Sequence, residues 1–186
     1  MKSVLISIKP KWCELIASGK KTVEVRKTKP KLETPFKCYI YETQGKLRWC
    51  NKCQDTDCER PYPNCACFEG RGKVIGEFVC DRFIASFLNN NDGWFIECGC
   101  LTQKEIDEYQ GDKAILYGWH ISDLVIYDKP RELSEFQLPC GHSNDCGTCK
   151  RAKHCIDPIN SEYRFSHCEL EIGLKRPPQS WCFVEV

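Results

Sequence analysis

The chain has 186 residues, a length that suits one domain and can bury a core without help from disulfides. Hydrophobic residues make up 41% and charged residues 28%, as in ordinary globular proteins, and no run approaches the roughly 18 apolar residues of a membrane span. The net charge of +1 excludes an argument for nucleic-acid binding from overall charge alone. The N-terminal residues lack the features of a signal peptide, so we expect a cytoplasmic protein.

Charge is distributed unevenly along the chain. Residues 1–43 hold ten Lys/Arg and four Asp/Glu, a net of +6. Residues 74–128 hold three Lys/Arg and ten Asp/Glu, a net of −7. We therefore expect the N-terminal part to contribute a basic surface, which is either a solvated face or a contact for an anionic partner.

The first quarter of the chain predicts three strands and one helix. Residues 4–8, 21–27 and 37–43 are short and rich in β-branched or aromatic side chains, as strands are. Pro10 and Gly19 frame a helix of two to three turns between the first two strands, because proline suits the first turn of a helix and glycine its end.

Strand signals return after residue 72. Residues 73–86 predict a strand, residues 114–121 and 124–130 predict two strands or a strand and a turn, and residues 180–186 predict a terminal strand. Residues 89–93 predict a turn, and Thr102 with Glu105 forms a capping box for a helix through about Tyr109. Small mixed domains of this kind commonly close their sheet into a barrel, which removes exposed edges. We predict a single α+β domain over residues 1–186, interrupted by cysteine-rich insertions at 44–72 and 137–174.

Residues 19–26 read GKKTVEVR and fit the pattern G-x-K-x-x-E-x-R through Gly19, Lys21, Glu24 and Arg26. With the segments 72–83, 117–133 and 176–186, this pattern resembles the ASCH domain family, and in particular its phage and bacterial branch. The resemblance implies a PUA-like mixed β-barrel with a few short helices and a cleft beside the motif strand. It also implies a role in recognising RNA or a modified nucleotide.

The motif residues suit more than one kind of chemistry. Glu24 and Arg26 share one face of their strand because side chains alternate, and Lys21 lies at the start of the strand, next to the end of the helix. The three can grip a phosphate or a base edge, or Glu24 can act as a base while Lys21 stabilises negative charge. A salt bridge that only ties the helix end to the sheet is the third interpretation.

Some members of the family resemble amidohydrolases that deacetylate acetylated cytidine. The resemblance matches Lys21 to their catalytic lysine and leaves Glu77 as the candidate for their catalytic glutamate. Glu24 stands where those members carry a threonine, and a carboxylate cannot replace that hydroxyl as a nucleophile without a change of mechanism. Trp119 and Trp181 are candidates for stacking against a base, with packing in the core as the alternative.

Sixteen cysteines are unusual for a chain without a signal peptide, and metal binding explains the clustered ones better than disulfides do. Two clusters each contain one C-x2-C pair and enough further ligands for a tetrahedral site. We predict structural zinc at one to two sites, with iron–sulfur clusters and unbound thiols as alternatives. The predicted ligands are Cys50, Cys53, Cys58, Cys65 and Cys67 in the first cluster and Cys140, His142, Cys146, Cys149 and Cys155 in the second.

Three functions follow from these observations. The leading one is a protein that binds nucleic acid or a modified nucleotide, with regulation as one role it can serve. The second is an enzyme, a hydrolase of a modified nucleoside or an RNA nuclease. The third is a zinc-stabilised module that binds a protein partner. The sequence predicts RNA or a modified nucleotide as the partner and no membrane.

Overall fold

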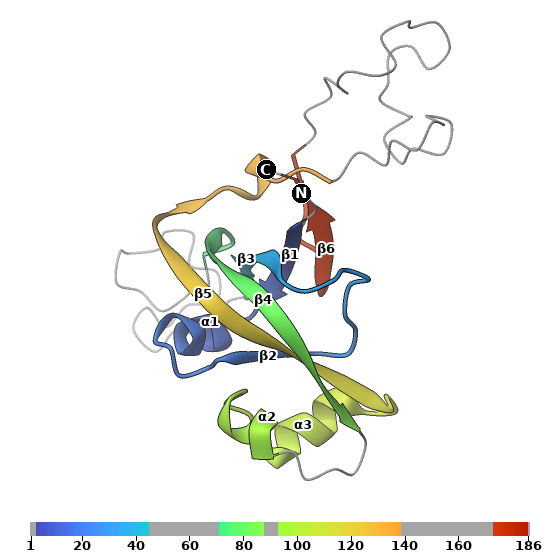
Figure 1. Cartoon of the computed structure of the whole chain (residues 1–186). Helices are drawn as coiled ribbons and strands as arrows, with labels where there is room; N and C mark the ends of the chain where they lie inside the picture. The colour runs from blue at the N-terminus through green and yellow to red at the C-terminus, as the bar shows by residue number, and fades with distance from the viewer. Residues whose placement is uncertain (1–2, 45–70, 88–92, 139–172, 186) are drawn as a thin grey trace, which may run out of the picture.

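The computed structural model describes residues 3–44, 71–87, 93–138 and 173–185. Its centre is a six-stranded sheet in the order β2-β5-β4-β3-β1-β6 (Figure 1). The strands are β1 (Ser3–Ile8), β2 (Val23–Arg26), β3 (Phe36–Glu42), β4 (Val74–Phe87), β5 (Ile115–Arg131) and β6 (Trp181–Val184). The helices are α1 (Pro10–Ala17), α2 (Gly93–Glu97), α3 (Gln103–Gln110) and the 3₁₀ turn η1 (Leu133–Glu135). No described helix is long and apolar enough to cross a membrane.

The sheet is mixed, and one of its pairings is parallel. β1 pairs with β3 in parallel, and every other neighbouring pair is antiparallel. The connection from β1 to β3 carries α1 and β2, as a parallel pairing requires a long crossover. The main hydrophobic core is formed by side chains of the sheet and of α1. Ile16 of α1 packs into this core and has no exposed surface. α1 is therefore fixed against the sheet directly before the motif strand.

The segment predicted as two strands, or a strand and a turn, is one continuous strand. β5 runs for 17 residues and pairs along most of its length with β4, which has 14. Asp123 has a φ of +47°, and the register with β4 shifts at three places. Such bulges bend a strand without ending it, so β5 passes through the polar Asp123 position that reads as a turn.

β2, at one end of the sheet, approaches β1 and β6 at the other end. The guanidinium of Arg26 in β2 donates to the carbonyl of Ser7 in β1. The indole Nε1 of Trp181 in β6 donates to the Thr28 hydroxyl just after β2, at 3.0 Å. The sheet is thus curled so that its ends meet through side chains. No backbone ladder joins β2 to β6 among the described residues, so closure into a barrel stays a prediction.

The predicted caps form, and one short helix escapes prediction. Pro10 opens α1, and Gly19 follows its end with a φ of +72°. Thr102 and Glu105 make the reciprocal capping box at the start of α3. α2 begins at Gly93, where the sequence predicts the last residue of a turn, and residues 89–92 lie outside the described part. Figure 1 shows α2 and α3 together at the end of the molecule where β4 ends and β5 begins.

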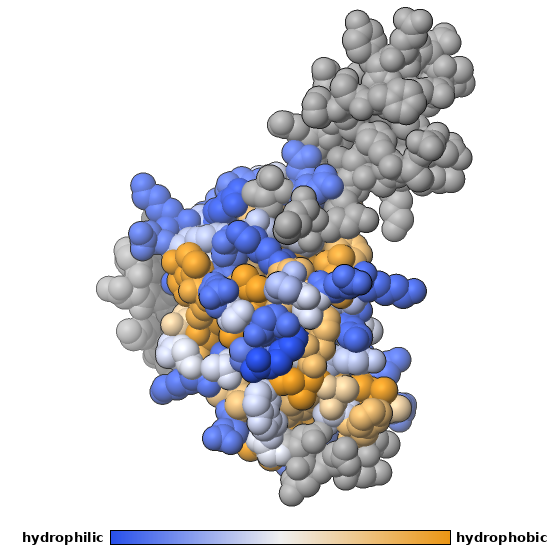
Figure 2. All heavy atoms as spheres, in the orientation of Figure 1, coloured by the Kyte–Doolittle hydropathy of each residue, from blue (hydrophilic) through white to orange (hydrophobic). Residues whose placement is uncertain are grey.

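The surface mixes polar and apolar residues. In Figure 2, hydrophobic atoms show between hydrophilic ones on the described part of this face. The described cysteines outside the two clusters are free thiols, and Cys13, Cys38 and Cys80 are buried, as ordinary core cysteines are. Burial raises the pKa of the Cys80 thiol to about 12, so it stays protonated.

Candidate functional site

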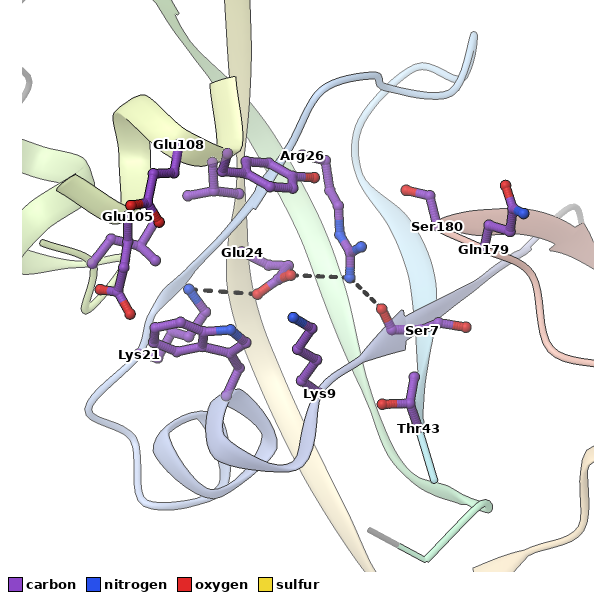
Figure 3. Close-up of a pocket in the computed structure, with 14 residues that line it drawn as sticks. Ser7, Lys9, Lys21, Glu24, Arg26, Thr43, Glu105, Glu108, Gln179 and Ser180 are labelled. Carbon is purple, nitrogen blue, oxygen red and sulfur yellow. Dashed lines mark hydrogen bonds and ion pairs between the residues drawn. The ribbon is translucent and has the colours of Figure 1, made fainter. Parts of the chain in front are cut away.

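A cavity of about 580 Å³ opens where β2, the end of β1, α1 and α3 meet (Figure 3). The C-terminal segment before β6 forms its remaining wall. Charged and polar side chains dominate the lining, with two aromatic rings among them. The lining residues are Ser7, Lys9, Trp12, Lys21, Glu24, Val25, Arg26, Thr43, Leu101, Glu105, Glu108, Tyr109, Gln179 and Ser180.

Three ionisable side chains form a buried line along the cavity floor. Arg26 Nη2 lies 3.0 Å from Glu24 Oε1, and Lys21 Nζ lies 3.5 Å from Glu24 Oε2. Lys21 is 2% exposed, Glu24 5% and Arg26 8%. One carboxylate faces two cations, so the buried group carries a net positive charge and favours an anionic or electron-rich ligand.

Main-chain carbonyls from two distant segments hold the cations in place. Lys21 Nζ donates to the Gly99 carbonyl at 2.6 Å, and Arg26 donates to the Ser7 carbonyl. Gly99 follows α2, and a Cβ built there would lie 2.4 Å from the Phe95 carbonyl oxygen. Only glycine therefore allows this tight turn, which aims the Gly99 carbonyl at the lysine.

Two polar atoms of this group, Glu24 Oε2 and Arg26 Nε, are buried without a hydrogen-bond partner among the described residues. Leaving such atoms without a hydrogen bond costs about 1–3 kcal/mol each. One is an acceptor and the other a donor, and both belong to residues that line the cavity. The site therefore holds one acceptor and one donor whose hydrogen bonds are not made by the described residues.

Aromatic and cationic side chains complete one side of the cavity. The ring of Trp12 lies 5.0 Å from Lys21 Nζ and 4.3 Å from Lys11 Nζ, centroid to nitrogen. Lys9 points its amine toward the buried trio in Figure 3 and has no carboxylate within 4.0 Å among the described residues. This side is suited to a planar ligand with a negative group.

The α3 side of the rim is acidic. Glu105 accepts hydrogen bonds from the Thr102 main-chain amide and from Lys11, and these lower its pKa to about 2. The Lys11–Glu105 ion pair, 3.0 Å long, bridges α1 and α3 at the rim. Tyr109 also lies on α3, and burial raises the pKa of its hydroxyl.

The main chain of β2 adds a further pair of polar groups. β2 is the end strand of the sheet, so one of its edges lacks a strand partner among the described residues. The Val23 amide donates to the Cys98 carbonyl across this edge at 3.1 Å. Because main-chain groups alternate along a strand, the amide and carbonyl of Val25 face the same way, and Val25 lines the cavity.

The structure brings together three of the predicted site residues and separates the others. Lys21, Glu24 and Arg26 meet at the cavity floor. Trp119 is fully buried, so its ring has no face on which a base can stack and its place is that of a core residue. Trp181 is partly buried, packs against Trp119 and does not line the cavity.

Glu77 lies away from the cavity. Its carboxylate is 2.6 Å from Lys37 Nζ and 2.6 Å from the Tyr127 hydroxyl, on β3 and β5 respectively. Burial alone would raise the pKa of Glu77, but the hydrogen bonds from Lys37 and Tyr127 outweigh it and lower the pKa. The structure therefore does not place Glu77 with Lys21 and Glu24 as a catalytic set.

Sequence reasoning missed Ser7, Trp12, Gly99 and Tyr109 as parts of the site. Each comes from an element without a family motif, and only the fold brings them to β2. The ten predicted metal ligands all fall in residues 45–70 and 139–172, outside the described residues. Within the described residues, no group of three or more His, Cys, Asp or Glu side chains is arranged to hold a metal.

Comparisons with known proteins agree with the motif. The family model described as the ASCH domain matches residues 6–132. The crystal structure of ASCH from Zymomonas mobilis is similar at 19% identity, over 86% of this chain and 84% of that chain, with a TM-score of 0.50. A mutant of that protein gives 20% identity over 73% and 78%, with a TM-score of 0.49. At this identity the likeness concerns the fold alone. No curated protein matches the chain.

Proposed function

We propose that this chain, which belongs to the ASCH domain family, binds a nucleotide through a base held in the cavity at β2. The observation that carries the proposal is the buried acceptor and donor, Glu24 Oε2 and Arg26 Nε, which lack hydrogen-bond partners among the described residues and lie beside an open cavity. Buried polar atoms of this kind are normally satisfied, and a base edge would satisfy both once the two side chains turn toward the cavity that their residues line.

The chemistry of a nucleobase edge fits these atoms. An exocyclic amino group can donate to Glu24 Oε2, as amino groups of bases do to carboxylates. A neighbouring ring nitrogen or carbonyl oxygen can accept from Arg26 Nε or from the Val25 amide. The cavity of about 580 Å³ lies in the range of small-molecule sites, and Lys9 at its edge can meet a phosphate.

A titration with nucleotides tests this proposal. We expect nucleoside monophosphates with an amino-bearing base to bind, and Glu24→Gln to weaken binding by roughly 1–3 kcal/mol because a charged hydrogen bond becomes neutral. Glu14→Gln, which removes an exposed carboxylate of α1 outside the cavity, is the matched control and should bind as the unmodified chain does. The proposal fails if no nucleotide binds, or if both variants behave alike.

A hydrolase acting on a modified nucleoside is the second candidate. Glu24 Oε2 lies 3.5 Å from Lys21 Nζ in the cavity, a geometry that supports a carboxylate base beside a cation. The distance of Glu77 from this pair weighs against the acetylcytidine mechanism of the related enzymes. An assay for acetate released from acetylated cytidine tests this candidate. Release that is lost in Glu24→Gln, while the nucleoside still binds, would favour the hydrolase over a protein that only binds.

Zinc binding by the two cysteine-rich insertions remains part of the proposal. The purified chain should carry about one to two zinc ions, because each cluster holds enough thiolates for a tetrahedral site. Replacing Cys146 and Cys149 together should lower the zinc content measured by elemental analysis. A fully folded, metal-free protein whose clustered thiols all react with a thiol reagent would contradict it. The cavity that the described residues form at β2 favours ligand binding over the protein-interaction module.

A further inference from the structure

We propose that the ligand is a single-stranded nucleic acid, and that Lys27 and Lys29 bind the phosphates beside the base held in the cavity. This inference rests on the proposed function, because it extends the same site. Both lysines follow Arg26 closely, at the point where β2 leaves the cavity. They form the outer lysine pair, a name used below for these two residues.

The outer lysine pair has no acidic partner. Neither Lys27 nor Lys29 has a carboxylate within 4.0 Å among the described residues. Half of the other cations on the described surface do have one, namely Lys11, Lys37, Arg71, Lys73, Arg82, Lys104 and Arg131. What sets the outer lysine pair apart is its place beside the cavity. Positive charge is therefore left uncompensated next to the cavity, where a phosphate would neutralise it.

The outer lysine pair contacts aromatic rings instead of carboxylates. Lys27 Nζ lies 5.1 Å from the ring centre of Tyr109, which lines the cavity. Lys29 Nζ lies 5.0 Å from the ring centre of Phe83 and 5.6 Å from that of Tyr117. A ring face attracts an ammonium group but leaves its other side free to meet an anion.

The residue between the two lysines is anchored. Thr28 accepts a hydrogen bond from Trp181 Nε1 at 3.0 Å, and Pro30 is buried. The anchors on both sides of Lys29 fix the short segment that carries the two lysines. Cations held in this way lose less conformational entropy when they bind phosphates.

The geometry favours a single strand over a duplex. A base can enter the cavity only if it is unpaired and turned out of a stack, which costs least in a single strand. Glu105 and Glu108 line the α3 side of the rim and repel phosphates there (Figure 3). The strand is therefore favoured to leave past Arg26, toward the outer lysine pair.

The test compares a nucleoside monophosphate with a five-nucleotide single strand of RNA, the same strand of DNA and a duplex, by titration against the full chain. We expect the single strands to bind at least tenfold more tightly than the monophosphate and the duplex. The double variant Lys27→Ala/Lys29→Ala should remove most of this gain. It should also reduce the slope of log affinity against log salt by about 1.4, or roughly 0.7 for each phosphate that the variant no longer neutralises.

The control is Lys113→Ala/Lys129→Ala, which removes two exposed lysines without a carboxylate within 4.0 Å among the described residues. It should bind the strand as the unmodified chain does. Thermal melting checks that both double variants fold.

The outcomes separate this inference from the proposed function. Binding of the monophosphate that depends on Glu24, with no gain from the longer strand, overturns the role of the outer lysine pair and keeps the cavity. Binding of the strand that depends on the lysines but not on Glu24 supports the outer lysine pair and overturns the cavity. Equal losses in the two double variants, or no binding of any strand, also overturn the inference.

Discussion

Glu24 and Trp119 lie directly opposite each other on β2 and β5, so one cross-strand pair joins the carboxylate of the cavity to the centre of the core. Trp119 is fully buried and its ring packs edge-on against Phe36 and Phe83. Because directly opposite residues project from the same face of a sheet, this aromatic cluster lies beside Glu24. This arrangement strengthens every electrostatic contact that Glu24 makes.

Trp119→Ala should destabilise the protein by about 3–5 kcal/mol, because a large buried aromatic side chain is replaced by a cavity. Urea unfolding measures this loss. Trp181→Ala, at the partly buried ring beside it, should cost less. A Trp119 variant that keeps its stability and loses only nucleotide affinity would contradict the assignment of this ring to the core.

Replacing Arg26 should lower the free energy of unfolding, because Glu24 is buried and loses one of its two cations. Arg26→Met leaves the carboxylate with Lys21 as its cation, and breaking a buried ion pair on one side costs about 3–5 kcal/mol. Adding Glu24→Leu should not recover that stability in full, since it removes the carboxylate but leaves the buried Lys21 without its ion-pair partner. A double-mutant cycle in urea measures the coupling. Additive effects would mean that the two side chains do not interact.

Gly99→Ala tests the turn that places Lys21. The added Cβ would meet the Phe95 carbonyl oxygen at 2.4 Å, so the turn must shift at a cost of roughly 1–3 kcal/mol. We expect a lower melting temperature together with weaker nucleotide binding, because the Gly99 carbonyl moves away from Lys21. Gly93→Ala meets no atom within 4 Å and is the matched control. Equal melting temperatures for the two variants would contradict this account.

The lowered pKa of Glu105 predicts that the free energy of unfolding falls at acidic pH. Its pKa falls from 4.5 to about 2 in the folded protein, so the stabilisation is complete above about pH 4.5 and is lost as the pH falls toward 2. Glu105→Gln should flatten the fall in unfolding free energy across this window, whereas Asp112→Asn, outside the ion pairs described, should not. Chemical unfolding at several pH values provides the measurement. An unchanged pH profile in Glu105→Gln would rule this out.

The sequence predicts the parts of the site that depend on local spacing. Glu24 and Arg26 meet because alternate residues of a strand share a face, and the Thr102–Glu105 capping box forms within one helical turn. These contacts need no knowledge of the fold. The family resemblance predicts a cavity beside the motif strand, but not which other segments form its walls.

The remaining parts depend on contacts between distant segments. The Gly99 carbonyl reaches Lys21 from 78 residues away, and the Ser7 carbonyl reaches Arg26 from 19 residues away. Full burial of Trp119 and partial burial of Trp181 follow from which strand is central and which is at the edge. Spacing in one sequence does not fix strand order, so these two tryptophans looked alike before the fold was known.

The most direct test of the central claim is a crystal structure of the full chain with the tightest-binding nucleotide. The account predicts a base in the cavity, with its polar edge within hydrogen-bonding distance of Glu24 Oε2 and Arg26 Nε, the two atoms of the buried trio that lack hydrogen-bond partners among the described residues. A nucleotide bound elsewhere on the protein, with those two atoms still without a hydrogen bond, would contradict it.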